Sequence, residues 1–310
     1  MKKKNKKSNP NKIIKKMTQK PKVYFTKILT PSRLVDIFNH LQKSLPSPLA
    51  IKIHSGEDGN QNFIRPDFFQ EIVNYTKGRI VETNTSGDGP RSTTEKHKKL
   101  LEKHKWTPLY DVDILDSDKP DLELETNGTK LKKNLVGSKI KNYKSMLVIA
   151  HFKGHQMGGY GGALKQLAIG CASSSGKSRI HSGGVCDDRI ECWKKLAEQD
   201  NFLECMAEAA YSIVKLFNGN MAFINVMKNI SIDCDCNGKA EPPCMMDVGI
   251  CASVDPVACD CACLDIIKNC EDSGKEKFLE RVNSKHGLHT IDVACDMGVG
   301  MKEYELVNID

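Results

Sequence analysis

The sequence predicts an α/β fold: a single large domain with a mainly parallel or mixed sheet flanked by helices. Short apolar runs alternate with helical segments of ten residues or more, which is typical of βαβ units. The run 145–151 (SMLVIAH) is apolar almost throughout, as expected for a strand buried on both faces of a sheet. The chain has 310 residues, of which 39% are hydrophobic, enough for a sizeable core.

Strands and helices alternate in the first half of the chain. Strands are expected at 23–25, 49–54, 79–82 and 109–115. Helical patterns lie between them, at 31–45, 66–77 and 94–105. Start signals support these helices, such as Thr30-Pro31 and the capping box from Ser92 to Glu95.

The second half repeats this alternation with different loops. After the strand at 145–151, we expect a glycine-rich loop, a helix from about Ala163 and a second helix at 202–217. A strand at 221–227, a loop at 233–243 and a strand at 248–252 should follow. Asp255 and Pro256 then stand at the N-cap and first position of another helix.

Charge is unevenly distributed along the chain, whose formal net charge is +7. Residues 1–22 hold ten Lys and no acidic residue, which leaves 36 basic against 39 acidic residues and a net charge of −3 for the remainder. We predict a disordered lysine-rich tail over 1–22 and one α/β domain over 23–310. The acidic body disfavours nucleic acid as a partner, except through the tail. No run of 18 apolar residues is present, so no membrane association is expected.

The 13 Cys are expected to lie in a reducing compartment. The N-terminus lacks the long apolar stretch of a secretory signal, and the odd number of Cys excludes complete pairing within the chain. We therefore predict a cytoplasmic protein in which the thiols stay free, bind metal or take part in chemistry.

The first candidate site lies where the strand at 145–151 ends and a helix begins. His151 and His155 offer acid–base capacity or metal ligation, and Lys165 offers a positive charge or a base. Glycines at a helix start let an anion approach the free backbone N–H groups. The glycines concerned are Gly158, Gly159, Gly161 and Gly162. The alternative is a glycine turn that packs helix on strand.

The second candidate site is the small, polar stretch 171–184. Its hydroxyl and basic side chains, among them Ser174, Lys177 and His181, suit a carboxylate or phosphate. A mobile surface loop explains the same composition equally well.

The third candidate site is the cysteine-rich region, because eight of the 13 Cys fall within 234–270. No Cys-x-x-Cys is present, which excludes a ferredoxin-type run or an ordinary zinc ribbon. A thiolate site for iron or zinc is stereochemically reasonable from four of the eight, Cys234, Cys236, Cys244 and Cys263. The alternative is that the thiols are small buried apolar groups, which we favour for Cys251, Cys259, Cys261 and Cys270.

The sequence also resembles a known family. Five segments carry the resemblance: 53–66, 84–97, 151–172, 225–267 and 303–310. They are similar to the uncharacterised iron–sulfur-center protein family, domain of unknown function 362 (DUF362). Longer members carry ferredoxin motifs after the region that matches 182–184, where this chain has only Cys186 and Cys192. The resemblance therefore implies the His/Gly-rich loop and the 233–236 segment with Cys244 and Cys263, but no ferredoxin module and no assigned reaction. A weaker similarity, over 155–165 alone, links the chain to nickel-dependent lactate racemase-like proteins.

These observations lead to three hypotheses. The first is an enzyme that acts on a small anionic molecule and carries an iron–sulfur cluster or a single iron or zinc ion. The second is a metal-free, racemase-like isomerase or transferase built on the glycine loop and Lys165. The third is a non-enzymatic module that stores or delivers metal, or that partners a separate ferredoxin.

Overall fold

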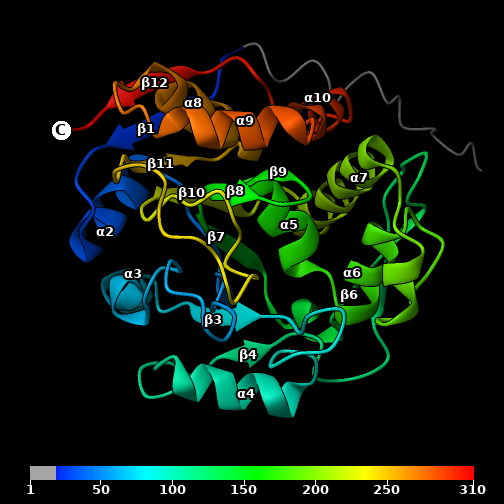
Figure 1. Ribbon diagram of the computed structural model, residues 1–310. Coiled ribbons are helices and arrows are strands. Elements are labelled where there is room, and N and C mark those ends of the chain that lie inside the picture. Colours follow the sequence, from blue (N-terminus) through cyan, green and yellow to red (C-terminus); the bar gives the residue numbers. More distant parts are fainter. Residues whose placement is uncertain (1–18) are drawn as a thin grey trace, which may run out of the picture.

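The computed structural model describes residues 19–310 and contains a mixed sheet of eight strands with helices on both faces (Figure 1). The order of the strands is β12-β1-β11-β10-β7-β2-β3-β4. Their bounds are β1 (Lys22–Thr26), β2 (Leu49–Lys52), β3 (Arg79–Glu82), β4 (Asp113–Ile114), β7 (Ser145–His151), β10 (Met221–Met227), β11 (Gly249–Ser253) and β12 (Glu305–Asn308). Two hairpins lie outside this sheet: β5 (Leu122–Glu125) with β6 (Lys133–Val136), and β8 (Lys153–His155) with β9 (Gly159–Gly161). The predicted α/β class with a mixed sheet is confirmed.

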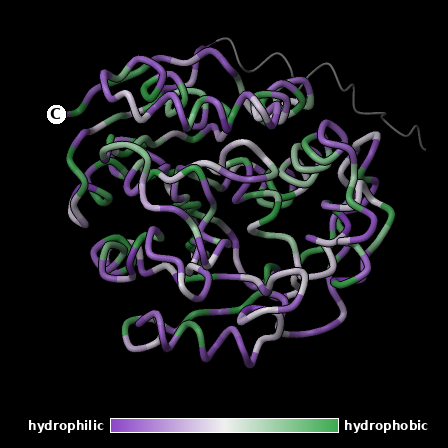
Figure 2. Tube along the Cα trace, in the orientation of Figure 1, coloured by the Kyte–Doolittle hydropathy of each residue, from purple (hydrophilic) through white to green (hydrophobic). Residues whose placement is uncertain are grey.

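Helices cover both faces of the sheet because the side chains of β7 alternate between two cores. Met146 and Val148 share one core with helices α5, α7 and α8, whereas Leu147 and Ile149 share the other with α2, α3 and α4. The helices are α2 (Pro31–His40), α3 (Gln70–Thr76), α4 (Thr94–Lys103), α5 (Ala163–Cys171), α6 (Ser174–His181), α7 (Gln199–Phe217), α8 (Pro256–Asn269), α9 (Lys275–Ser284) and α10 (Leu288–Asp296). Figure 2 shows that α4 and α9, at opposite ends of the view, are largely hydrophilic.

The sheet topology defines where a ligand can enter. Strands β4, β3, β2, β7 and β10 are mutually parallel, and β11 is antiparallel to its neighbours β10 and β1. The chain proceeds from β2 toward β3 and β4, then returns to β7 and proceeds in the opposite direction toward β10. The strand order thus reverses between β2 and β7, and ligands of open α/β sheets bind at the carboxyl ends of the strands at such a point.

Two segments differ from the expectations. The strand expected at 109–115 is reduced to the two residues of β4, because Leu109 and Tyr110 instead close a turn onto the carbonyl of Trp106. The stretch at 171–184 contains α6, which begins after Ser173, whose hydroxyl accepts a hydrogen bond from the N–H of Gly176 at 3.0 Å. The mobile-loop interpretation of this stretch is therefore wrong over α6.

The predicted lysine-rich tail lies mostly outside the described residues, which begin at residue 19. Two of its lysines are placed: Lys22 begins β1, and Lys20 lies 3.1 Å from Glu303. No helix between residue 19 and the end of the chain combines the length and apolar character needed to cross a bilayer.

Candidate functional site

A cavity of about 220 Å³ opens at the carboxyl ends of β2 and β3 and beside the segment that follows β7. Its walls come from segments far apart in the sequence, including the loops after β2 and β3, helices α5 and α6, and the loop after β10. Most of its lining is charged or polar, and includes Lys52, Glu57, Glu82, Arg91, His155, Lys165, Gln166, Lys177, His181 and Cys236. The cavity therefore lies at the point where the strand order reverses between β2 and β7.

Three potential metal ligands meet at one wall of this cavity. One ligand atom from each of His155, Cys234 and Cys236 lies within 4.8 Å of the other two. His155 and Cys236 line the cavity, and Cys234 is fully buried behind them. Two of the four predicted metal-binding cysteines are thus brought together, with a histidine that the sequence placed in a different candidate site.

The surroundings of Cys234 favour its thiolate. Lys165 Nζ donates a hydrogen bond to Cys234 Sγ at 3.3 Å, and the backbone N–H of Cys236 approaches the same sulfur at 3.4 Å. Burial opposes ionisation, but the thiol of Cys236 and the positive charges of Lys165 and Lys153 outweigh it and hold the pKa of Cys234 well below its usual value. The pKa of the Cys236 thiol is raised well above its usual value, because that thiol donates to Cys234 and is itself buried.

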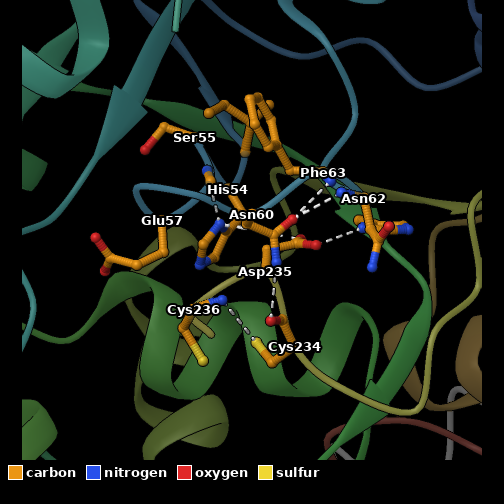
Figure 3. Close-up of polar contacts among 12 residues, drawn as sticks. His54, Ser55, Glu57, Asn60, Asn62, Phe63, Cys234, Asp235 and Cys236 are labelled. Atoms are coloured by element: carbon orange, nitrogen blue, oxygen red, sulfur yellow. Dashed lines mark hydrogen bonds and ion pairs between the residues drawn. The ribbon is translucent and has the colours of Figure 1, made fainter. Parts of the chain in front are cut away.

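Asp235 fixes the thiol segment, which we define as residues 234–236. Its Oδ1 lies 2.8 Å from His151 Nδ1, and its Oδ2 lies 3.1 Å from Lys153 Nζ. Although burial raises the pKa of this carboxyl, the charges of His151 and Lys153 reverse the effect and leave the pKa lowered. Figure 3 shows the thiol segment packed against the loop that follows β2, and the N–H of Glu57 in that loop donates to the carbonyl of Asp235 at 2.8 Å. His151, a predicted catalytic residue, thus anchors the segment.

The protonation of His155 follows from its hydrogen bonds. Its Nδ1 accepts from the backbone N–H groups of Met157 at 3.1 Å and Gly158 at 2.8 Å. Nδ1 therefore carries no proton, so neutral His155 has its proton on Nε2. Burial, with the charge of Lys165, lowers the pKa of His155 and favours this neutral form, which donates a hydrogen bond to Cys234.

The cations of the cavity fall into two kinds. Lys52 and Arg91 have carboxylate partners, Glu82 at 2.8 Å and Glu57 at 3.1 Å. Lys165 contacts only the sulfur of Cys234, as described above, and has no carboxylate partner among the described residues.

Lys177 is the second lysine of the cavity without a carboxylate partner in the described part of the chain. Its Nζ donates to Thr83 Oγ1 at 2.6 Å and to the carbonyl of Ala172 at 2.7 Å. Burial lowers the pKa of Lys177 to about 7. Neither Lys165 nor Lys177 is paired with a carboxylate of the described residues, so both nitrogens can interact with an anion in the cavity.

Two buried polar atoms of residues that line the cavity have no hydrogen-bond partner between residue 19 and the end of the chain: Gln166 Nε2 and His181 Nδ1. Their residues are only 7% and 8% exposed. The ring of His181 is stacked on Phe202, with centroids 5.0 Å apart, and packs at 5.2 Å against Trp193. Burial lowers the pKa of His181 to about 3, so the imidazole is neutral near pH 7.

The glycine-rich loop does not offer the anion site that the sequence predicts. The N–H groups of Ala163 and Leu164, at the start of α5, donate to the two carboxylate oxygens of Asp260 at 2.7 and 3.0 Å. The helix start is therefore occupied by a carboxylate of the chain itself. Two of the four glycines are closely packed: a Cβ on Gly162 would lie 2.9 Å from Phe152 and collide with Asp260, and a Cβ on Gly159 would lie 2.9 Å from the Cα of Gly287.

The other predicted residues lie apart from the thiol segment. Cys244 Sγ donates to the carbonyl of Ile230 at 3.3 Å, and Cys263 lies in the apolar core with Cys251 and Cys259. Neither belongs to the three-residue ligand group, so the four-thiol arrangement is not formed. Ser174 donates its hydroxyl to the carbonyl of Thr85 at 2.9 Å and does not line the cavity.

Several residues of the site escape sequence reasoning. Lys52 and Glu82 end the strands β2 and β3, and their position near the carboxyl ends of parallel strands was the available signal. Gln166 follows Lys165 directly and carried no signal of its own. Asp260 lies in the cysteine-rich helix α8, and its contact with the start of α5 could not be inferred from the local sequence.

Comparisons with known proteins identify similar structures and the family of the chain. The lactate racemase apoprotein from Thermoanaerobacterium thermosaccharolyticum is similar at 14% identity and a TM-score of 0.42, over 67% of this chain and 50% of that chain. A protein from Thermotoga maritima is similar at 10% identity and a TM-score of 0.38, over 88% of this chain and 60% of that chain. The chain thus spans less than two thirds of the length of either structure. No curated protein matches the sequence. A family model described as a domain of unknown function (DUF362) matches residues 49–265, and the chain belongs to this family.

Proposed function

We propose that the chain is an enzyme that binds a small anionic substrate in the cavity, beside a soft metal ion held by Cys234, Cys236 and His155. The observation that carries the proposal is the approach of these three ligand atoms to within 4.8 Å of one another at the cavity wall. Two thiols and an imidazole are ligands that zinc and iron accept. Three protein ligands also leave a coordination position open, as in catalytic metal sites.

The residues present fit such an ion in kind and spacing. Cys234 is held as a thiolate before any ion arrives, so that ligand need not lose a proton on binding. Because only two thiols meet here, the ligand set favours a single ion over an iron–sulfur cluster. When bound, the ion would polarise an oxygen of the substrate or of a water molecule.

The chain's own residues would bind and orient the anion. Lys165 supplies a positive charge that no carboxylate of the described residues neutralises, and Lys177 supplies further N–H donors. Carboxylates and phosphates share the oxygen acceptors that these donors recognise. The neutral imidazole of His181 can accept or hand on a proton at Nδ1.

A metal-free enzyme is the second candidate, and the state of His155 favours it. Because Nδ1 accepts two backbone N–H groups, the proton on Nε2 must be lost before that nitrogen can ligate. In this candidate, Lys165 and the Nε2 proton of His155 stabilise the Cys234 thiolate in place of an ion.

Metal binding under anaerobic conditions tests the proposal. We expect one zinc or ferrous ion per chain by equilibrium dialysis, and loss of that ion in Cys234→Ser and Cys236→Ser. Cys263→Ser is the matched control, because it removes a buried thiol outside the ligand group. Unchanged stoichiometry in the first two variants would reject the metal site. Anion binding is measured separately, by thermal shift with carboxylates and with phosphate. Anion binding that survives in both cysteine variants but is lost in Lys165→Ala would support the metal-free candidate.

A further inference from the structure

Lys177 differs from the other lysines of the cavity in what its nitrogen contacts. The side chain is 6% exposed, lines the cavity and donates to two neutral oxygens, Thr83 Oγ1 and the carbonyl oxygen of Ala172. Lys52 lines the same cavity but lies 2.8 Å from the carboxylate of Glu82. A buried ammonium normally has such a partner, and Lys177 lacks one among the described residues.

The two hydrogen bonds of Lys177 match those of a neutral amine. An ammonium has three N–H donors, whereas an amine has two and one lone pair. With two acceptors present, the amine satisfies both, and its lone pair remains free. The ammonium would instead leave one buried donor unpaired. Burial is the main cause of the lowered pKa; Asp116 opposes it, and the positive charge of Lys52 adds to it. Glu82 and Arg91, the other charged groups that act on this nitrogen, oppose each other.

The surroundings of this amine suit a substrate with two functional groups. A desolvated lysine amine near other cations is a nucleophile for carbonyl carbons. Lys165, on the neighbouring helix α5, lines the same cavity and offers a positive charge to a carboxylate. His181 lies four residues after Lys177 on α6, so the two side chains lie on the same face of that helix.

We propose that Lys177 is a catalytic residue that condenses with the carbonyl group of a small 2-oxo acid. The inference rests on the anion-binding part of the proposed function and is independent of the metal. The amine lone pair attacks the carbonyl carbon, and the carbonyl π electrons move to oxygen. The resulting carbinolamine then loses that oxygen as water. A C=N bond replaces the C=O bond, both hydrogens of the water come from the amine, and no oxidant or reductant is required.

Trapping of the imine tests the proposal. The full-length protein is incubated with glyoxylate and cyanoborohydride at neutral pH, with a chelator present, and modified lysines are mapped by mass spectrometry. We expect Lys177 to be carboxymethylated at least about tenfold faster than any other lysine, as its larger neutral fraction near neutral pH implies. Lys52 is the internal control from the same cavity, because its nitrogen lies 2.8 Å from the carboxylate of Glu82. Preferential modification of Lys177 in the presence of the chelator supports the inference, whether or not the dialysis experiment finds a bound metal ion.

A second aldehyde and one variant complete the test. Formaldehyde lacks a carboxylate, so it reports on the amine alone, and the preference for Lys177 should be smaller than with glyoxylate. Lys177→Met removes the amine without introducing a charge, and should abolish the fast adduct while retaining the far-ultraviolet circular dichroism of the wild type. Modification of all lysines at similar rates would overturn the proposal. Preferential reaction with formaldehyde but not with glyoxylate would overturn the assignment of a 2-oxo acid.

Discussion

His151 Nδ1 and Asp235 Oδ1 lie 2.8 Å apart, although 84 residues separate them in the sequence. His151 ends the central strand β7, and Asp235 lies between the two thiols of the site. This contact and the ion pair of Asp235 with Lys153 connect the thiol segment to the sheet. The positions of Cys234 and Cys236 therefore depend on one buried carboxylate.

Replacement of that carboxylate should destabilise the protein strongly. Asp235→Asn leaves the ammonium of Lys153 buried without its partner, and we expect a loss of about 3 kcal/mol in the free energy of unfolding. Chemical denaturation measures this loss. The control is Asp233→Asn, because Asp233 lies in a more accessible pair 3.5 Å from Arg281 and should cost less than about 1 kcal/mol. Equal losses in the two variants would contradict the anchoring role.

Lys165 should control the ionisation of Cys234. In Lys165→Met the ammonium 3.3 Å from the sulfur is lost, so the pKa of Cys234 should rise. A pH titration of the ultraviolet absorbance of the thiolate reports this change. Lys165→Arg retains the positive charge and should shift the titration less. Superimposable titrations of Lys165→Met and the wild type would show that the lysine does not stabilise the thiolate.

Anion binding should take up protons just above neutral pH. The pKa of Lys177 is about 7, so the amine is mostly neutral at slightly higher pH, and a bound anion raises that pKa by favouring the ammonium. Calorimetric titration with phosphate or a carboxylate, in buffers of different ionisation enthalpy, measures the uptake. We expect a fraction of a proton per anion in the wild type and none in Lys177→Met. Uptake that persists in the variant would assign the proton to another group.

The glycine-rich loop should tolerate a methyl group at one position and reject it at another. Gly162→Ala places a Cβ against the Asp260 carboxylate and 2.9 Å from Phe152, and should cost about 1–3 kcal/mol. Gly158→Ala is the matched control, because its nearest neighbour is the flexible end of Met206, at 3.3 Å. Denaturation of both variants checks the difference. If the glycines instead bound a ligand, Gly158→Ala would impair anion binding without loss of stability.

Much of the fold could be predicted from the sequence because local patterns were strong. The strands β3, β7 and β10 match their predicted bounds, since each is a short run bounded by turn residues and buried at nearly every position. The expected N-cap of α8 is also confirmed, as Asp255 accepts a hydrogen bond from the N–H of Ala258 at 2.9 Å. Helix α6 was missed because its sequence, rich in serine with one glycine, has low helix propensity, and packing against α7 and β6 compensates.

The candidate site was less predictable because its parts are distant in the sequence. Cys234 and Cys236 could be singled out because they lie close together in the loop predicted over 233–243. No local pattern could separate them from Cys263, which lies on a helix whose buried face points into the apolar core. Nor could spacing reveal that Asp260 occupies the helix start that the glycines were expected to offer to a ligand.

Trp193 gives the cavity an optical reporter of its own. The chain has two tryptophans, and Trp106 is fully buried, with its indole N–H donating to the carbonyl of Ser55 at 3.1 Å. Trp193 is 42% exposed and packs on His181 at the cavity wall. The fluorescence of Trp193 should therefore be emitted at longer wavelength than that of Trp106, and should respond to whatever molecule occupies the space beside His181. Intrinsic emission can thus follow the filling of this cavity in the unlabelled protein, before its substrate is known.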